Sequence, residues 1–96
     1  MKKSKYSIVR TYSAGVFFAI IKSRKGQEAV IDKARRVWYW SGAASLSQMA
    51  VEGVKNPGQC KIAMPVDGVV LTQVIEILPC SVEAERNLSG VPIWKQ

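Results

Sequence analysis

The segment ARRVWYW, residues 34–40, constrains the fold more than any other part of the chain. Successive side chains of a β-strand point to opposite faces. One face of a strand here carries Arg35, Val37 and Tyr39, and the other carries Arg36, Trp38 and Trp40. A half-solvated strand keeps one face polar, whereas both of these faces combine an arginine with aromatic rings. We therefore expect the strand to be covered on both sides, by the rest of a small domain or by a second subunit.

The pattern around this strand predicts a small α+β protein with a mainly antiparallel β-sheet and two short helices. A chain of 96 residues, 48% of them apolar, is expected to form a single domain over residues 1–96. We expect residues 1–5 to be a flexible tail. Runs of β-branched and aromatic residues predict three opening strands, at 7–12, at 16–22 and at 28–40, the last of them continuous or broken near Asp32 and Lys33.

Two serines mark the starts of the predicted helices. Ser45 opens a capping box with Gln48, and Gly53 ends the short helix that follows. Ser81 is expected to cap a last helix that runs to Leu88.

The segment between the two helices is predicted to return to the sheet. Residues 61–64 predict a short strand, and Asp67-Gly68 predicts a hairpin turn. The run VVLTQVIEIL, residues 69–78, is apolar at too many positions for its period to separate a strand from a buried helix. Its valines and isoleucines, and Pro79 at its end, favour a strand.

Basic residues are concentrated in the first third of the chain. Up to residue 36 there are ten lysines and arginines against two acidic residues, whereas the other sixty residues carry one net negative charge. This concentration predicts a positive face that attracts phosphate groups. The alternative is a charged surface that only keeps the protein soluble.

Residues 34–45 place an arginine pair, aromatic rings and small residues side by side. The small residues Ser41 to Ser45 lead into a helix whose first amide groups attract an anion. An arginine adds bidentate contacts to a phosphate, and an aromatic ring stacks on a base. Arg10 to Gly15 repeats the order of arginine, aromatic ring and small residues, and both segments are expected to line one pocket. The candidate ligand-binding residues are Arg10, Tyr12, Arg35, Arg36, Trp38, Tyr39, Trp40, Ser41, Gly42 and Ser45. The alternative places Trp38 and Trp40 in the core and the arginines at its rim.

Several other kinds of site find no support in the sequence. The chain has no histidine, no paired carboxylates and no serine beside a base, so we expect no catalysis. Cys60 and Cys80 lie in no CxxC spacing, and we expect buried thiols without a metal or a cofactor. The longest apolar run, residues 14–21, is too short to cross a membrane, and no signal-peptide pattern follows the lysine-rich start. We expect a cytosolic protein without a membrane partner.

Four segments carry a resemblance to a known family. YSIVRTYSAGVFF, ARRVWYWSGAASLSQMAVEG, VIEILP and the closing Trp94 together resemble a family of small proteins from tailed bacteriophages and prophages. The resemblance extends over nearly the whole chain. It implies a phage gene product that acts in the cytoplasm of the host bacterium, and it transfers no catalytic or binding residue.

Three non-catalytic functions fit these features. The first is a phage anti-defence protein that sequesters a nucleotide-type immune signal, such as a cyclic oligonucleotide or a cyclic ADP-ribose-like molecule. The second is nucleic-acid binding, which explains the charge but has no known fold signature in this sequence. The third is a protein interface, formed by the aromatic strand, in phage assembly or host takeover. The two-faced strand also predicts a homo-oligomer.

Overall fold

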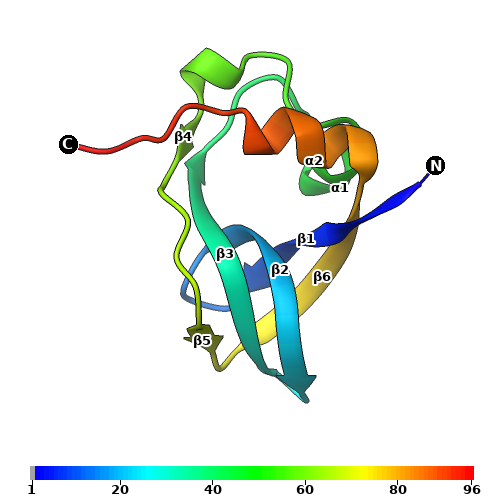
Figure 1. Ribbon diagram of the computed structural model, residues 1–96, viewed down its shortest axis with the longest axis vertical. Helices are drawn as coiled ribbons and strands as arrows, with labels where there is room; N and C mark the ends of the chain where they lie inside the picture. The colour runs from blue at the N-terminus through cyan, green and yellow to red at the C-terminus, as the bar shows by residue number, and fades with distance from the viewer. Residues whose placement is uncertain (1) are drawn as a thin grey trace.

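Three long strands open the chain and pair in sequence order, as their β-branched and aromatic residues predict. In the computed structural model, which describes residues 2–96, these strands are β1 (Lys3–Thr11), β2 (Val16–Lys25) and β3 (Glu28–Tyr39). The sheet order is β4-β3-β2-β1-β6, with every strand pair antiparallel (Figure 1). β4 (Lys61–Ile62), β5 (Val69–Leu71) and β6 (Val74–Ser81) complete six strands. Together with two helices, they confirm the predicted α+β class.

β1 starts earlier than the sequence predicts. The expected flexible tail over residues 1–5 is corrected for Lys3 to Lys5, which belong to this strand, while Met1 lies outside the described residues. Two contacts with the far end of β6 hold the segment. Lys3 pairs with Ser81, and the amide of Val82 donates to the carbonyl of Lys2 at 3.0 Å. The ladder bonds to β6 therefore order residues whose side chains alone favour a tail.

β3 is one continuous strand, and it carries an extra residue near Asp32 and Lys33. The pairing with β2 advances by two residues on β2 and by three on β3 at this point, and Lys33 has a positive φ of 50°. A bulge adds one residue to the strand, so side chains after it face the opposite side of the sheet from the one that strict alternation would give them. Ile31 before the bulge and Ala34 after it pack in the same core, so Arg35 points to the opposite side.

Residues 69–81 form two strands that join the two edges of the sheet. β5 pairs with β3, and after two further residues β6 pairs with β1, so the sheet curls back on itself at this end. The predicted hairpin at Asp67-Gly68 is wrong, because β4 and β5 both pair with β3 and not with each other. Pro79 does not close the strand but lies inside β6, where an edge position tolerates a residue without an N–H.

The two helices begin at the predicted serines. α1 (Leu46–Glu52) is capped by the Oγ of Ser45, which accepts from the amide of Gln48 at 3.1 Å. α2 (Val82–Ser89) is capped in the same way by Ser81, whose Oγ accepts from Ala84 at 3.0 Å. A short 3₁₀ turn, η1 (Pro57–Gln59), precedes β4. Over residues 2–96, neither helix has the length and apolar character needed to cross a membrane.

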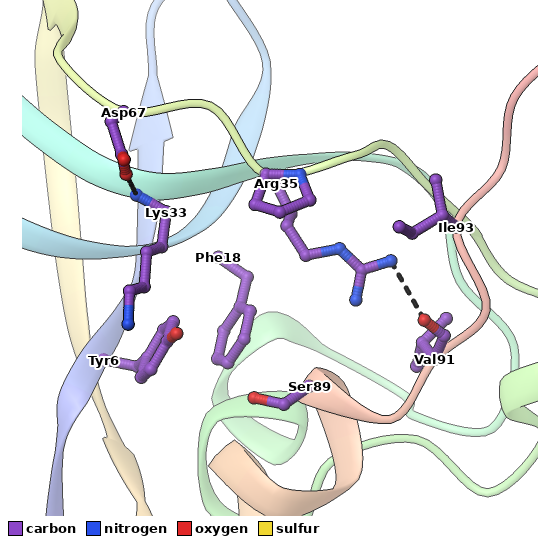
Figure 2. Close-up of a pocket in the computed structure, with 9 residues that line it drawn as sticks. Tyr6, Phe18, Lys33, Arg35, Asp67, Ser89, Val91 and Ile93 are labelled. Atoms are coloured by element: carbon purple, nitrogen blue, oxygen red, sulfur yellow. Dashed lines mark hydrogen bonds between the residues drawn. The ribbon is translucent and has the colours of Figure 1, made fainter.

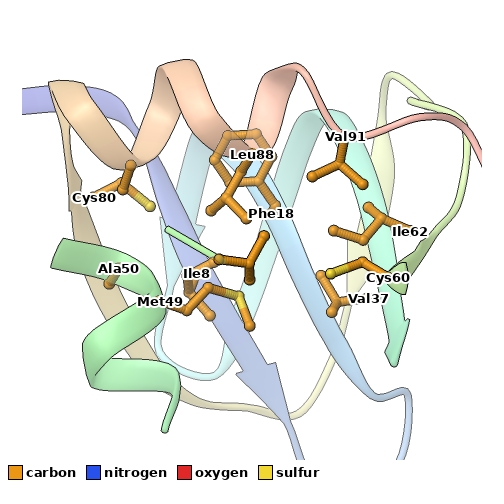
Figure 3. Packing of buried hydrophobic residues seen from close by; sticks show 12 residues of the cluster. Ile8, Phe18, Val37, Met49, Ala50, Cys60, Ile62, Cys80, Leu88 and Val91 are labelled. Atoms are coloured by element: carbon orange, nitrogen blue, oxygen red, sulfur yellow. The ribbon is translucent and has the colours of Figure 1, made fainter. Parts of the chain in front are cut away.

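The sheet separates two hydrophobic cores. Both helices lie together over one face, where Phe18 and Ile8 from the sheet meet Met49 of α1 and Leu88 of α2 (Figure 3). The second core fills the curl of the sheet and is made of Val9, Phe17, Ala19, Ala29, Ile31, Ala34, Leu71 and Val74. Cys60 and Cys80 are buried free thiols in the first core, as the sequence predicts.

Candidate ligand-binding groove

A groove of about 510 Å³ lies where the β1–β2 loop meets the end of β3. We call it the Arg36 groove, and its walls are Ser13, Ala14, Gly15, Val16, Arg36, Val37, Trp38 and Trp40. The pairing of Val16 with Val37 brings the two walls together, because the loop before β2 then lies beside the residues after Val37. Parts of both predicted segments therefore line one groove: Ser13 to Gly15 from the first, and Arg36, Val37, Trp38 and Trp40 from the second.

Hydrogen bonds from a single threonine fix the loop wall of the groove. The Oγ1 of Thr11 donates to the carbonyl of Gly15 at 2.8 Å and accepts from the amide of Ala14 at 2.9 Å. The amide of Thr11 also donates to the carbonyl of Gly15. Small side chains on a fixed turn leave space above Arg36, which a larger residue at these positions would fill.

Arg36 is the charged group of the groove. Its guanidinium carbon lies 4.8 Å from the centre of the Phe17 ring and 5.8 Å from that of Trp38. Such cation–π contacts are worth about 0.5–2 kcal/mol each, depending on exposure. Its Nε is buried and has no hydrogen-bond partner among residues 2–96. Because the Nε is closed off from solvent, the terminal nitrogens of the guanidinium, which also have no hydrogen-bond partner among these residues, are the groups that a ligand in the groove can meet.

Two tryptophans supply the aromatic surface. Trp38 is 60% exposed and meets Trp94 edge to face, with ring centres 6.3 Å apart. Trp40 is half-buried, packs against the main core and donates from Nε1 to the carbonyl of Ala43 at 3.1 Å. Trp40 thus has a fixed ring at the base of the groove, while Trp38 presents an open ring at its rim.

Arg35 is placed elsewhere, on the helix side of the sheet. It is 5% exposed, and four of its N–H groups donate to the backbone carbonyls of Ile62, Ala63, Leu88 and Val91 at 2.8–3.2 Å. Leu88 belongs to the last turn of α2, where the helix dipole favours a cation. Burial lowers the pKa of Arg35, and nearby Tyr6 opposes this effect. Arg35 therefore joins β3 to α2 and the C-terminal segment, and it does not reach the Arg36 groove.

The small residues 41–45 do not form an open anion cradle. Gly42 has a φ of 99°, and a Cβ at this position would collide with the backbone of Lys55 and Asn56. This close approach of two backbone segments allows a hydrogen bond within the chain, in which the amide of Lys55 donates to the carbonyl of Gly42 at 3.1 Å. Ser41 is bonded to Asn56, and Ser45 is used as the cap of α1. Gln48 also accepts from the amide of Ala44 at 2.7 Å, so the chain itself occupies the groups expected to bind an anion.

The three remaining predicted residues lie outside the groove. The Nε of Arg10 donates to the Oε1 of Glu76 on β6 at 3.1 Å, with both side chains about half exposed. Tyr12 is 76% exposed at the loop tip. Tyr39 is exposed on the face opposite Trp38, where it pairs with Lys61 of β4. The structure therefore brings together Arg36, Trp38 and Trp40 out of the ten predicted residues.

Two neighbours of the groove were not among the predicted site residues. Phe17 lies under the guanidinium of Arg36, and Trp94 lies beside Trp38. Phe17 is directly opposite Arg36 in the β2–β3 register, which is the register that the hairpin turn at Gly26 sets, because the extra residues in β2 and β3 compensate each other. Trp94 reaches the site from the C-terminal segment, where its amide donates to the carbonyl of Ile62. No local sequence pattern indicates this second contact.

Residues 2–96 hold no cluster of three or more His, Cys, Asp or Glu side chains that could bind a metal. Burial raises the pKa of the Cys80 thiol to about 12, with a smaller contribution from Glu85. This thiol is therefore protonated at neutral pH, a poor state for a nucleophile.

Comparison with known proteins assigns the chain to a family. The family model described as Domain of unknown function (DUF6948) matches residues 4–88, which include most of α2 and all of the six strands except the first residue of β1, so the chain belongs to this family. No curated protein matches the chain. No solved structure matches it either.

Proposed function

We propose that this member of the DUF6948 family is a non-catalytic binding protein whose Arg36 groove holds a nucleotide-type ligand. The observation that carries the proposal is Arg36 itself, which lines the groove with its guanidinium near the rings of both Phe17 and Trp38. A guanidinium and an exposed indole are the groups that recognise a phosphate and a base, respectively.

The dimensions of the groove favour a small ligand over a polymer. A volume of about 510 Å³ lies within the usual range for small-molecule sites, roughly 300–1,000 Å³. Stacking of a base on an aromatic ring contributes roughly 1–3 kcal/mol, and Trp38 offers such a ring at the rim. Trp40 and the Thr11-fixed loop provide rigid walls, which limits the entropy lost on binding.

The proposed role of this binding is sequestration of a nucleotide-type immune signal by a phage protein. A protein that only binds its ligand lowers the free concentration of that ligand without any chemical step. The phage context rests on the resemblance of the four sequence segments. The ligand classes proposed are cyclic oligonucleotides and cyclic ADP-ribose-like molecules, acting in the host cytoplasm.

A thermal-shift screen tests the proposed ligand class. We expect one of the cyclic dinucleotides, cyclic trinucleotides or ADP-ribose derivatives to raise the melting temperature of the protein. A ligand at 100 times its dissociation constant stabilises the folded state by about 2.7 kcal/mol, which corresponds to several degrees for a chain of this size. A screen in which none of these nucleotides shifts the melting temperature would contradict the proposal.

Nucleic-acid binding is the second candidate, and the β2–β3 hairpin favours it. Lys22, Arg24 and Lys25 are all exposed toward the far end of this hairpin, away from the helices. The dependence of affinity on salt concentration separates nucleic-acid binding from the binding of a small nucleotide. Contacts to six to ten phosphates of an oligonucleotide would lose roughly 10³–10⁵ in affinity between 50 and 200 mM salt. A nucleotide held by two or three phosphates and a stacked base is expected to lose about tenfold or less.

Self-association is proposed as well, because aromatic side chains remain exposed at the end of β3. Trp38 and Tyr39 point to opposite faces and both are more than half exposed. A symmetric partner would cover one of these faces. Light scattering at tens of micromolar protein is expected to give the mass of a dimer or larger, and a monomeric mass would contradict this part of the proposal.

A further inference from the structure

A second cavity lies on the opposite side of β3 from the Arg36 groove. It has a volume of about 340 Å³, and we call it the Arg35 pocket after the residue in its wall (Figure 2). Tyr6 and Phe18 line it from β1 and β2, and Ser89 and Val91 line it from the end of α2 and the segment beyond. The Arg36 groove and the Arg35 pocket share no lining residue.

The Arg35 pocket contains a buried cation without a carboxylate partner. Arg35 has five N–H donors, of which four bind backbone carbonyls. Its remaining N–H, on Nη1, has no partner in the part of the chain that the structure describes. The carbonyls carry only partial negative charges, and no carboxylate among residues 2–96 forms an ion pair with this guanidinium.

Lys33 adds a second cation to the same cavity, and the bulge in β3 places it there. Its positive φ turns the chain so that the side chain of Lys33 extends past the Tyr6 ring (Figure 2). The backbone N–H of Lys33 donates to the Oδ1 of Asp67 at 2.8 Å. That carboxylate also borders the cavity, so two cations and one anion leave one net positive charge in its wall.

The rest of the wall is aromatic and apolar. Tyr6 stacks on Phe18, with ring centres 4.4 Å apart and an interplanar angle of 12°. Val91 and Ile93 form the opposite side. A cavity with a flat apolar wall and a net positive charge fits a ligand with a flat apolar body and a negatively charged head.

We infer that the Arg35 pocket is a second ligand site, for a small organic acid whose carboxylate or phosphate head meets the ammonium of Lys33, with Arg35 adding positive charge to the same cavity, and whose flat body lies against Tyr6 and Phe18. This site is independent of the Arg36 groove, and it needs no nucleotide base. Its head group is recognised by charge, while its body is recognised by apolar contact.

Titration with matched probes, followed by two-dimensional NMR, tests the inference. Benzoate and phenyl phosphate are the anionic probes, and benzamide is the neutral control of nearly the same shape. Probes of about ten non-hydrogen atoms are expected to bind with a dissociation constant of about 1 mM or tighter. We expect benzoate or phenyl phosphate to shift the backbone amide signals of Tyr6, Lys33 and Val91, and benzamide to bind at least about tenfold more weakly.

Lys33→Asn removes the ammonium group with little strain, because asparagine tolerates a positive φ. We expect this substitution to weaken the anionic probe by about tenfold or more. Lys22→Asn is the matched control, since it removes the same charge from an exposed position of β2 that lines neither cavity, and it is expected to leave the affinity within about twofold.

Three results would overturn the inference: no shift of the pocket amides at several times the expected dissociation constant, equal binding of benzoate and benzamide, or equal affinity of the wild type and Lys33→Asn for the anionic probe. The probe comparison uses the wild-type protein, so it decides the question whether or not a variant folds. Trp38→Ala is expected to leave probe binding unchanged, which separates this site from the Arg36 groove.

Discussion

Arg35 and Arg36 are neighbours in the sequence, and the structure gives them different environments. Arg35 is buried and bound to four backbone carbonyls, whereas Arg36 is partly exposed and lies between aromatic rings. The expectation that both arginines line one pocket therefore does not hold for Arg35, which is not among the residues of the Arg36 groove. Alternation along a strand predicts that the two side chains diverge, but only the tertiary fold determines which of them meets the end of α2.

Methionine substitutions separate these two roles, because methionine keeps the long stem of arginine without its charge. Arg35→Met leaves several buried carbonyls without their donors, and we expect it to lower the free energy of unfolding by about 3 kcal/mol or more. Arg36→Met loses two cation–π contacts but also removes a buried donor without a partner, and we expect a smaller loss of about 1–2 kcal/mol. Urea denaturation of both variants measures the difference. Equal losses would show that Arg36 is also a structural residue.

The buried thiol of Cys80 makes the stability of the protein depend on pH above about pH 9. Its pKa is raised to about 12 in the folded state by burial first and by Glu85 second, against an ordinary value near 9 in the unfolded chain. Between these two values the unfolded chain has lost the thiol proton that the folded protein keeps. The thiol therefore favours unfolding as the pH rises above about 9, by up to about 1.4 kcal/mol per pH unit.

Cys80→Ala isolates this contribution. We expect the free energy of unfolding of the wild type to fall more steeply than that of the variant between about pH 9 and pH 12, although the variant starts lower because of the cavity it creates. Urea denaturation across this pH range measures both slopes. Parallel curves would mean that the thiol titrates alike in the folded and unfolded states.

β3 is the element on which the arrangement of the sites depends. The extra residue at Lys33 breaks the strict alternation of the strand, so that Ile31 and Ala34 share one core and Arg35 faces the helices. The amide of Lys33 and the side chain of Asp32 both bond to the Asp67–Gly68 turn, which holds the bulge in place. A regular strand through these residues would direct Arg35 toward the core in which Ile31 packs and would open neither cavity as observed.

Replacement of a lysine by glycine is expected to have opposite effects on stability at two positions, one in the bulge and one in a regular part of the sheet. A residue other than glycine at a positive φ is strained by about 1–2 kcal/mol, so Lys33→Gly is expected to raise the free energy of unfolding by about 0.5–1 kcal/mol. Lys25→Gly, in the part of β2 that pairs regularly with β3, is expected to lower it by a similar amount. Thermal or urea unfolding measures both. A loss of stability in Lys33→Gly would show that the lysine side chain contributes more than its strain costs.

Several elements of the fold were predictable because their signals are local. Ser45 and Ser81 cap the helices as expected, and the opening strands follow their β-branched residues. The hairpin at Asp67-Gly68 was wrong because its turn chemistry is the same whether it joins paired strands or folds back onto β3. The anion cradle at residues 41–45 has the right composition, but its backbone groups are used by Lys55 and Asn56, which no short pattern indicates.

At the scale of the whole molecule, the curled sheet places two cavities on opposite sides of one strand. β5 and β6 join the two edges, so the sheet has an inner core of its own and an outer face covered by α1 and α2. The Arg36 groove opens beside the β1–β2 loop, and the Arg35 pocket opens beside the end of α2. A chain of 96 residues thus has two separate cavities with no lining residue in common.

The indole N–H signals of the three tryptophans test the central claim most directly. Trp38, Trp40 and Trp94 each give one such signal in a two-dimensional NMR spectrum, so a titration with cyclic dinucleotides, cyclic trinucleotides and ADP-ribose derivatives reports on the Arg36 groove itself. We expect one of these nucleotides to shift the Trp38 signal in a saturable manner, and Arg36→Met to weaken that binding by about tenfold or more. Nucleotide binding that leaves the Trp38 signal in place, or an affinity unchanged by Arg36→Met, would contradict the account.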